Sequence, residues 1–420
     1  MTSEQECYVY IVLPGETEFV TAGRFTLRES REGAAVGEFI YGRSYRERAN
    51  AVELDPVELR LQPGAFETAK MGGFFGAIRD AMPDAWGRQV IERHLRGELS
   101  RFDYLLRAPD DRAGALGFGR NTAPPFPQNR YNRTLDLERL QQAADALIND
   151  DPELPGSAAE QAEDLLLLGA TSMGGARPKA VVEDDDALWI AKFARTDDSY
   201  NQPRTEHGLL ELARLCGLDA ADSRLTTVAN RDVLLVRRFD RDPGDGGYRR
   251  HRMVSAVTLL RTDDDPTMRT DWSYLLLADE IRRVSTAPQD DLRELFRRMV
   301  FNAAISNLDD HPRNHAILAR EGGWRLSPAY DLTPFAVIAQ QRALALDCGL
   351  SGRGANKANL LSGHGRFMLS REEATQLFAG IVEIVRTEWQ PALRRAGVGA
   401  PECERLSRAF LYEGLFYDGS

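Results

Sequence analysis

The sequence predicts an α+β fold with a β-rich N-terminal part and a mainly helical C-terminal part. The first indication is the spacing of apolar residues, which alternate with polar ones up to about residue 62 but follow helical spacing over most of the chain beyond about residue 256. The second is the stretch NTAPPFPQ at 121–128, whose three prolines cannot continue a helix or a central strand. We therefore expect three regions: an N-terminal accessory subdomain (1–120), a mixed region with a Gly-rich loop (121–255) and a helical region (256–420).

The N-terminal region is expected to begin with a small β unit. Its apolar and polar positions alternate in four short runs separated by Gly, Glu and Pro: YVYIVL, FVTAGRFTL, VGEFIY and VELRL. Helical patterns follow in FFGAIRDAMPDAWGRQVIERHL. Asp84 stands just before the second of these helices, so we expect its carboxylate to cap that helix.

Composition narrows the classes of protein to consider. No stretch approaches the roughly 18 to 20 apolar residues of a membrane span, and the N-terminus has no basic region of the kind that opens a signal peptide. The cysteines are far apart and form no C-x-x-C pair, which argues against a zinc site and a disulfide framework: Cys7, Cys216, Cys348 and Cys403. We expect a cytoplasmic protein with no membrane contact. Its net charge of −11 predicts DNA contact only through a local basic face or a basic partner.

A Gly-rich loop is predicted within GATSMGGARPKAVV at 169–182, between an apolar helix and a strand. Glycines allow backbone N–H groups to approach phosphate oxygens closely, so this loop is a candidate for nucleotide binding. The candidate contacts are Ser172, Met173, Gly174, Gly175 and Ala176. A plain turn between helix and strand would explain the same glycines.

A lysine and a glutamate follow this loop on apolar faces. In the strand DALWIAKFA, Lys192 shares a face with Leu188 and Ile190. In the helix PRTEHGLLELARL, helical spacing places Glu206 on the stripe of Leu209, Leu210 and Ala213. The two charges could satisfy one another, and this is the order in which kinases place their phosphate-binding pair. The alternative is an edge-strand lysine whose charged end reaches solvent.

The run DVLLVRRFDR at 232–241 is expected to be a strand that leaves the core toward a hinge. In a kinase this segment would meet adenine, with Val236, Arg237 and Phe239 nearest. A buried strand with a charged exit explains the run equally well.

Two acidic motifs predict a phosphoryl-transfer site: LDDHPRN at 308–314 and SPAYDLTPF at 327–335. Asp309 would accept the proton of an acceptor hydroxyl, and Asn314 and Asp331 would hold Mg²⁺. Asp309 and Asn314 are five residues apart, as in a kinase catalytic loop, but the His-Arg-Asp and Asp-Phe-Gly signatures are absent. The preceding helix should end near Asn307 and is buried along one stripe: Leu292, Leu295, Phe296, Met299, Val300 and Ala303. Considered alone, the first loop could also consist of ordinary turn residues.

Together these motifs resemble the HipA family of bacterial toxin serine/threonine kinases. The resemblance rests on GATSMGGARPKA, WIAKF, RRFDR, LDDHPRN and SPAYDLTPF, in this order, and extends to FFGAIRDAMPDAWGR and RAGALGF. It implies a two-lobed, protein-kinase-like fold preceded by a β-rich subdomain. It also implies ATP and Mg²⁺ as cofactors, phosphorylation of an aminoacyl-tRNA synthetase, and neutralisation by a helix-turn-helix antitoxin that carries the complex to DNA.

The resemblance assigns roles to individual positions. Asp309 matches the family's catalytic base, Asn314 and Asp331 its metal ligands, and Lys192 its triphosphate-binding lysine. Ser172 matches the serine that the family autophosphorylates.

Two further positions complete the comparison with the family. His311 matches a histidine beside the nucleotide, whereas Asp310 stands where other members have Gly and adds a charge expected to alter metal or substrate preference. Two alternatives stay open: a phosphotransferase acting on a small-molecule hydroxyl, and a non-catalytic co-repressor bound to the antitoxin.

Overall fold

In the computed structural model the chain forms two compact units, each assembled from segments that are not contiguous in sequence. Unit 1 comprises Met1–Arg195, Arg237–Arg261 and Leu318–Gly323, and unit 2 comprises Thr196–Val236, Thr262–Ile317 and Trp324–Ser420. The structure describes residues 3–29, 33–95, 99–127, 130–149, 166–167, 175, 177–184, 187–265, 267, 269–320 and 323–419. One unit boundary falls between Val236 and Arg237, within the segment that was expected to lead to a hinge.

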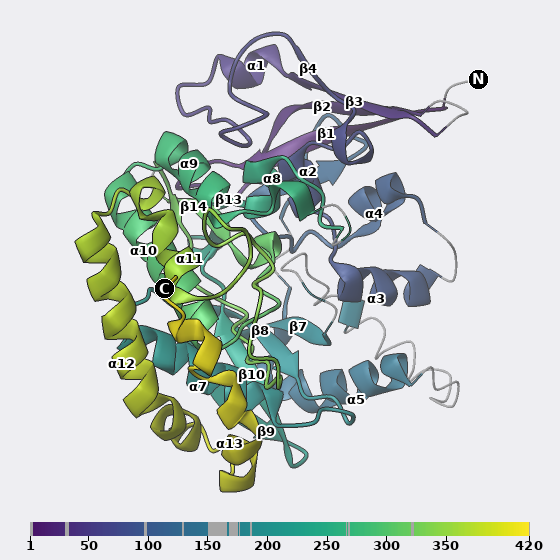
Figure 1. The fold of residues 1–420 in the computed structure, drawn as a ribbon. Helices are drawn as coiled ribbons and strands as arrows, with labels where there is room; N and C mark the ends of the chain where they lie inside the picture. The colour runs from purple at the N-terminus through teal and green to yellow at the C-terminus, as the bar shows by residue number, and fades with distance from the viewer. Residues whose placement is uncertain are drawn as a thin grey trace. The chain divides into compact units, whose positions relative to one another are not determined.

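Unit 1 begins with an antiparallel sheet of order β4-β3-β2-β1-β5 (Figure 1). Its strands are β1 (Ser3–Val12), β2 (Phe19–Glu29), β3 (Ala35–Tyr41), β4 (Ala65–Thr68) and β5 (Leu116–Gly119). Side chains alternate between the two faces, and Val9, Ile11, Phe25 and Phe39 are fully buried. The predicted β unit is therefore present, with β5 added from a segment about a hundred residues downstream of β1.

The run VELRL is not a strand, contrary to expectation. Asp55 is buried, and its Oδ1 accepts the backbone N–H groups of Val57, Glu58 and Leu59 at 2.8, 2.6 and 3.2 Å. These bonds bend the chain into a turn that alternation of apolar residues does not reveal. Burial raises the pKa of Asp55 to about 6.

Unit 1 also contains the helices α1 (Arg43–Arg46), α2 (Gly76–Asp80), α3 (Ala85–Leu95), α4 (Arg101–Arg107), α5 (Leu137–Ile148) and α8 (Ala256–Leu260). Asp80 ends α2 and accepts the backbone N–H of Ser255 at 2.7 Å and the hydroxyl of Thr258 at 2.6 Å, which fastens α2 to α8. The N–H of Gly87 donates to Asp84 Oδ1 at 2.8 Å, which confirms the predicted cap of α3.

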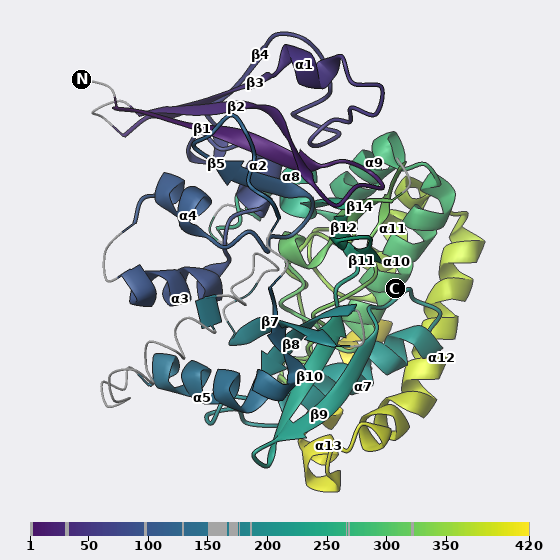
Figure 2. The same ribbon diagram turned by 180° about the vertical axis from the view of Figure 1, so that it is seen from behind.

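The middle of unit 1 contains β6 (Asn132–Arg133), β7 (Lys179–Asp184) and β8 (Ala187–Phe193), followed by the hairpin of β11 (Arg241–Gly244) and β12 (Gly247–Arg250) (Figure 2). Strand β6 runs parallel to β7, and β7 is antiparallel to β8. Leu188 and Ile190 pack with Val181, Tyr131 and Tyr248 in a buried cluster, so the predicted inward face of β8 is confirmed. Two further strands are β13 (Arg252–Ser255) and β14 (Ala316–Arg320).

A buried ionic cluster joins two of the motifs seen in the sequence, RRFDR and RAGALGF. Arg238 donates to Asp240 at 2.8 Å and to the carbonyl of Arg112 at 2.8 Å, and also pairs with Asp111. Arg241 donates to Asp240 at 2.7 Å. All four ionic side chains, those of Asp111, Arg238, Asp240 and Arg241, are at most 1% exposed. Burial raises the pKa of Asp240, but Arg238 and Arg241 outweigh that effect and hold it well below its usual range.

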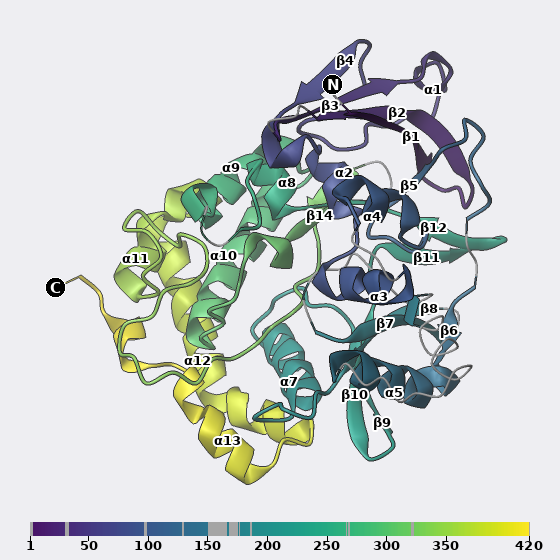
Figure 3. The same cartoon turned by 90° about the vertical axis from the view of Figure 1, so that its right-hand side faces the viewer.

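Unit 2 is mainly helical, as predicted (Figure 3). It contains the hairpin of β9 (Ser223–Val228) and β10 (Arg231–Arg237), the short β15 (Gly323–Leu326) at its margin, and the helices α7 (Gln202–Leu215), α9 (Tyr274–Val284), α10 (Pro288–Ala304), α11 (Lys357–Ser362), α12 (Arg371–Arg395) and α13 (Ala400–Leu406). Helix α12 packs against α7 and α10, and α9 packs on α10. Among the described residues, none of the helices has the length and apolar character needed to cross a membrane.

Helix α10 is the centre of unit 2. Its six predicted stripe residues, from Leu292 to Ala303, are fully buried. The helix ends at Ala304, earlier than the expected end near Asn307, because Ser306 adopts a left-handed backbone with φ 53°. The N–H of Asn307 then bonds to the carbonyl of Asn302 at 2.8 Å and closes the end of the helix.

Candidate active site

The loop after α10 carries Asp309, His311 and Asn314 in one compact turn. The N–H of His311 donates to the carbonyl of Asp309 at 2.8 Å, and the N–H of Asn314 donates to the carbonyl of His311 at 2.9 Å. The side-chain amide of Asn314 also donates to the Asp309 carbonyl, at 3.1 Å. Asp309 reaches solvent with part of its side chain still covered, and Asn314 is buried. The loop thus holds the two predicted functional side chains on a rigid base, where Asn314 can still offer its amide oxygen to a cation.

Asp331 is brought to the same unit by the segment 327–331, which follows β15. The N–H of Ala329 donates to the carbonyl of Asp219 at 2.7 Å, and the hydroxyl of Tyr330 donates to the carbonyl of Arg313 at 2.7 Å. The second bond ties the two acidic motifs to each other. Asp331 has φ 60°, a left-handed conformation that few residues other than glycine adopt. Backbone strain of this kind gathers at ligand-binding positions, where neighbouring structure enforces it.

The charge of Asp331 contributes to the pKa of Asp309. The pKa of Asp309 is raised, first by its partial burial and also by the negative charge of Asp331, whereas His311 and Arg269 lower it. The Nδ1 atom of His311 is buried and has no hydrogen-bond partner among the described residues. The site therefore holds two interacting carboxylates beside a polar atom that lacks a partner, and a cation would relieve the repulsion between the carboxylates.

The donors in this loop fit a magnesium ion. Mg²⁺ prefers hard oxygen ligands and is usually held by one or two carboxylates, with waters and substrate phosphates completing its coordination. Asp331 and the Asn314 amide oxygen are such ligands. No cluster of three or more His, Cys, Asp or Glu side chains suited to a metal occurs in the described part of the chain, so a cage made entirely of protein ligands is not indicated there.

The Asp310 side chain is buried beneath the loop. Its side chain is 3% exposed, accepts a hydrogen bond from the hydroxyl of Tyr274, and lies 2.9 Å from His315 Nε2. That second contact lacks the geometry of a hydrogen bond, so we treat it as an electrostatic contact. Asn302 donates to the Tyr274 hydroxyl at 3.1 Å. Burial turns the Asp310 carboxylate toward a polar network beneath the loop, and the effect of its charge on metal or substrate preference stays a prediction.

Lys192 and a second lysine lie side by side on unit 1. Lys192 on β8 is half-buried, and its cross-strand partner on β7 is Lys179. The ammonium of Lys179 is buried and lies 2.7 Å from Asp84 Oδ2, and it also donates to the carbonyl of Gly175 at 3.2 Å. Lys179 thus joins the end of the Gly-rich loop to the start of α3. Sequence analysis missed this lysine, although it directly follows the loop in GGARPK.

Gly175 is the one predicted loop contact that the structure describes. Its φ is 96°, and a Cβ atom there would lie 3.3 Å from Lys179 Nζ, so both the backbone conformation and the close approach favour glycine. The N–H of Trp86 bonds to its carbonyl at 3.4 Å. The other predicted loop contacts lie outside the described residues: Ser172, Met173, Gly174 and Ala176.

The remaining predicted residues lie in different units. Val236 is buried at the end of β10 in unit 2, whereas Arg237 is exposed and Phe239 is buried in unit 1. Glu206 lies half-buried on α7 in unit 2, with Leu209, Leu210 and Ala213 fully buried as predicted. Because Lys192 belongs to unit 1, its pairing with Glu206 stays a prediction, as do the three adenine contacts.

Comparisons with known proteins agree with these motifs. The model of the HipA-like C-terminal domain matches residues 171–389. "Putative kinase Y4mE" of Sinorhizobium fredii (strain NBRC 101917 / NGR234) is 27% identical over 339 residues, which cover 74% of each chain. Y4dM of the same strain is 24% identical over 163 residues, 36% of this chain and 38% of Y4dM.

A solved structure shares the fold. In the complex of HipA, HipB and operator DNA from Shewanella oneidensis MR-1, the matched chain superimposes with a TM-score of 0.68 and 15% identity, over 96% of this chain and 94% of that chain. At this identity the likeness shows the fold, which is the two-lobed HipA kinase-like fold expected from the motifs. The family model covers more than half of the sequence, and the chain therefore belongs to the HipA-like, kinase-like family.

Proposed function

We propose that this protein is an ATP- and Mg²⁺-dependent serine/threonine-protein kinase that serves as the toxin of a toxin–antitoxin pair. The observation that carries the proposal is the joined pair of acidic motifs in unit 2. Asn314 is bonded to the Asp309 backbone, Tyr330 ties the segment of Asp331 to the same loop, and the two carboxylates influence each other's charge. A phosphoryl-transfer site requires a base and a cation held in this way.

In the proposed mechanism Asp309 would accept the proton of an acceptor hydroxyl as the hydroxyl oxygen bonds to the γ-phosphorus of ATP. The bond from that phosphorus to the β,γ-bridging oxygen breaks, and ADP leaves with the electron pair. Asn314 and Asp331 would hold Mg²⁺, which supplies positive charge to the triphosphate. Lys192 would bind the phosphates from β8, and Lys179 would fix the end of the Gly-rich loop through Asp84. Val236, Arg237 and Phe239 would contact adenine, and His311 would lie beside the nucleotide.

The central test compares phosphoryl transfer by the purified protein and by Asp309→Asn in Mg-ATP, with mass spectrometry as the readout. We expect Asp309→Asn to lose transfer by at least a hundredfold, since general-base catalysis contributes about 10²- to 10⁴-fold, while binding of Mg-ATP changes little. Asp279→Asn removes a carboxylate from the exposed side of α9 and should leave transfer unchanged. Turnover by Asp309→Asn at the wild-type rate would refute the assigned base.

Autophosphorylation at Ser172 belongs to the same proposal. A phosphate there would carry about −1.5 to −2 charges in a loop proposed to hold ATP, so it should repel the nucleotide. The wild type incubated with Mg-ATP should gain one phosphate at Ser172 and bind Mg-ATP more weakly. Ser172→Ala should stay unmodified there. A phosphorylated sample that binds Mg-ATP as tightly as the unmodified protein would contradict this switch.

The biological role is proposed from the family. The Shewanella relative is recorded with HipB and its operator DNA, and we propose a helix-turn-helix antitoxin as partner of this chain and, through it, DNA. The proposed target is an aminoacyl-tRNA synthetase. Brief induction of the wild type and of Asp309→Asn, followed by phosphoproteomics, should show phosphate on such an enzyme only with the wild type. Phosphate found on a small molecule instead would favour the alternative phosphotransferase.

A further inference from the structure

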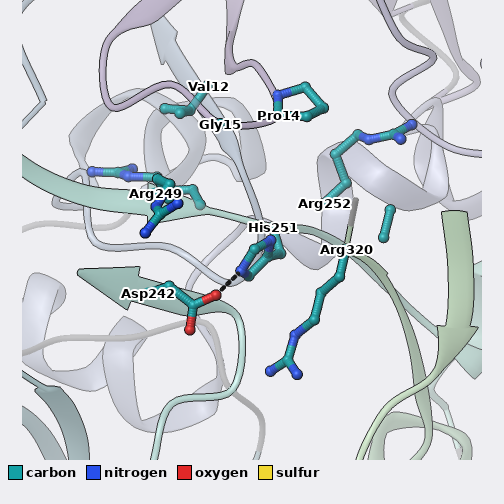
Figure 4. A pocket seen from close by; sticks show the side chains of 10 residues that line it. Val12, Pro14, Gly15, Asp242, Arg249, His251, Arg252 and Arg320 are labelled. Atoms are coloured by element: carbon teal, nitrogen blue, oxygen red, sulfur yellow. Dashed lines mark hydrogen bonds and ion pairs between the residues drawn. The ribbon is translucent and has the colours of Figure 1, made fainter. Parts of the chain in front are cut away.

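A pocket in unit 1 is lined by none of the residues assigned above to catalysis. It has a volume of about 370 Å³ and is lined by Val12, Pro14, Gly15, Asp242, Arg249, Arg250, His251, Arg252, Ala319 and Arg320 (Figure 4). These residues come from the end of β1 and its turn, the β11–β12 hairpin, the start of β13, and β14. The volume is at the lower end of the range for small-ligand sites, which is about 300–1,000 Å³.

The charge of the lining is strongly one-sided. Four arginines and a histidine line the pocket, against one carboxylate, that of Asp242. This is unusual in a chain whose net charge is −11. A local concentration of cationic side chains in a concave surface raises the positive potential there and attracts anions.

Two of the arginines are buried and neutralised by carboxylates. Arg250 lies 2.8 Å from Asp110 and places its guanidinium over the ring of Phe19, and Arg252 lies 2.6 Å from Glu53. Their side chains are only 1% and 3% exposed. These two ion pairs anchor the segment from Arg250 to Arg252. Because their charges are neutralised by carboxylates, Arg250 and Arg252 form part of the pocket wall and are not the residues that would attract a ligand.

The other two arginines are exposed, and within the described residues they bond to backbone carbonyls. Arg249 donates to the carbonyl of Pro243 at 2.8 Å, and Arg320 donates to the carbonyl of Phe239 at 2.7 Å. A guanidinium has five N–H donors, so most of those on Arg320 are left for a ligand. Gly244 permits the folded position of Arg249, because a Cβ there would lie 3.2 Å from Arg249 Cγ. Both side chains are therefore positioned by the backbone, and no carboxylate among the described residues pairs with either of them.

His251 stands between these arginines in Figure 4, with its Nε2 atom 2.6 Å from Asp242 Oδ2. The carboxylate fixes the ring, as a partner on one imidazole nitrogen commonly does. We propose that this pocket is a binding site for a phosphate-sized dianion, with Arg249 and Arg320 as its principal ligands. Arginine suits this role because its planar fork matches two phosphate oxygens.

The pocket's shape favours a single phosphate monoester over the backbone of a nucleic acid. A cavity of about 370 Å³ accommodates one anionic group with a few attached atoms, whereas a duplex needs an extended basic track. The phosphate could belong to a small metabolite or to a phosphorylated side chain of a protein segment. Either source presents the same dianion to Arg249 and Arg320.

Isothermal titration of the full chain with inorganic phosphate tests the site. The double variant Arg249→Gln with Arg320→Gln should weaken phosphate binding at least tenfold. The matched control, Arg43→Gln with Arg133→Gln, removes the same charge from exposed positions of unit 1 outside the pocket and should bind as the wild type does. Acetate should bind at least tenfold more weakly than phosphate. Equal binding of acetate, or an unchanged affinity in the pocket variant, would overturn the proposal.

Two further variants separate this site from the nucleotide site and from simple unfolding. Asp242→Asn removes the one carboxylate of the lining and should tighten phosphate binding severalfold. Because misfolding would weaken binding, tighter binding also shows that the variant is folded. Lys192→Ala should leave phosphate binding in the pocket unchanged. Binding that disappears in Lys192→Ala but persists in the Arg249 and Arg320 variant would assign the phosphate to the nucleotide site and refute the pocket, without bearing on the kinase assignment.

A phosphoserine peptide and its unphosphorylated form identify the source of the dianion. Tighter binding of the phosphopeptide than of inorganic phosphate supports a phosphorylated protein segment, and equal binding supports a small phosphorylated molecule. Either result is consistent with a dianion-binding site in the pocket. Binding of the unphosphorylated peptide as tight as that of the phosphopeptide would overturn it.

Discussion

At the scale of single residues, the charge state of Asp309 follows from its surroundings. A base must be ionised to accept a proton, and the raised pKa means that Asp309 ionises at higher pH than an ordinary aspartate. Partial burial is the main cause and the charge of Asp331 adds to it. The folded chain therefore binds a proton at Asp309 more readily than the unfolded chain, so the stability that the protonated group contributes is lost as pH rises through the raised pKa.

We expect an NMR titration of ¹³C-labelled aspartate to place the Asp309 midpoint above 3.8, its ordinary value. Asp331→Asn removes a neighbouring negative charge and should lower that midpoint. Asp347→Asn, which removes a carboxylate of unit 2 that does not act on Asp309, should leave it unchanged. Phosphoryl transfer in the wild type should fall as pH decreases through the same midpoint. A midpoint at or below 3.8 would contradict the assigned environment.

Asp310 should act as a positioning residue, through the backbone it shares with Asp309. Asp310→Asn keeps the shape but removes the charge beside His315, and Tyr274→Phe removes the hydroxyl that donates to Asp310. Leaving buried polar groups unpaired costs about 1–3 kcal/mol, which should appear as a loss of unfolding free energy in urea. We expect kcat to fall while the KM for ATP changes little. Asp290→Asn, at an exposed position at the start of α10, serves as the control. Equal kinetics in all variants would show that the network around Asp310 does not position Asp309.

At the scale of elements, the ionic cluster joins the strand β11 to the segment before β5, and its members are Asp111, Arg238, Asp240 and Arg241. Gly114 contributes as well, since its N–H donates to Asp240 Oδ2 at 2.9 Å. The cluster connects segments more than a hundred residues apart, and its members are shielded from water. A buried ionic cluster specifies one arrangement strongly, because any partner left alone is a costly charge.

Asp240→Asn should therefore lower the free energy of unfolding of the chain by about 3–5 kcal/mol, because it leaves two buried guanidinium groups without their shared carboxylate. The depressed pKa of Asp240 gives the corresponding pH dependence: its stabilisation is present above the ordinary value of 3.8 and is lost as the pH falls below it. Urea denaturation measured at several pH values checks both statements. Asp245→Asn, on the exposed turn of the same hairpin, should change neither quantity, and a similar loss in both variants would show that the cluster adds nothing specific.

At the scale of the whole molecule, the chain passes repeatedly between its two units, and the residues proposed for catalysis are divided between them. Lys192 and Lys179 lie in unit 1, whereas Glu206, Asp309, Asn314 and Asp331 lie in unit 2. Under the proposed function, catalysis would depend on residues of both units.

A double-mutant cycle on Lys192 and Glu206 measures that dependence. If the two side chains pair in the working enzyme, Lys192→Met and Glu206→Gln should each raise the KM for ATP, and the double variant should be little worse than either single one. The expected coupling is about 0.5–3 kcal/mol. Glu211 lies on the same helix but pairs with Arg214, so Lys192→Met with Glu211→Gln should be additive. If the effects of Lys192→Met and Glu206→Gln are also additive, the proposed pairing of Lys192 with Glu206 is refuted.

The sequence alone determined what depends on neighbouring residues. The buried stripe of α10, the Asp84 cap and the strand containing Leu188 and Ile190 follow from periodicity and capping within a few residues, and the compact loop from Asp309 to Asn314 follows from turn chemistry. The tertiary structure decided what depends on distant residues: the turn at VELRL created by buried Asp55, the contact of Lys179 with Asp84, and the inward direction of Asp310. The physical reason is that periodicity shows which face of an element is buried but not what the rest of the chain places against it. Lys179 and Asp84 are 95 residues apart, and only folding shows that each is the other's counter-ion.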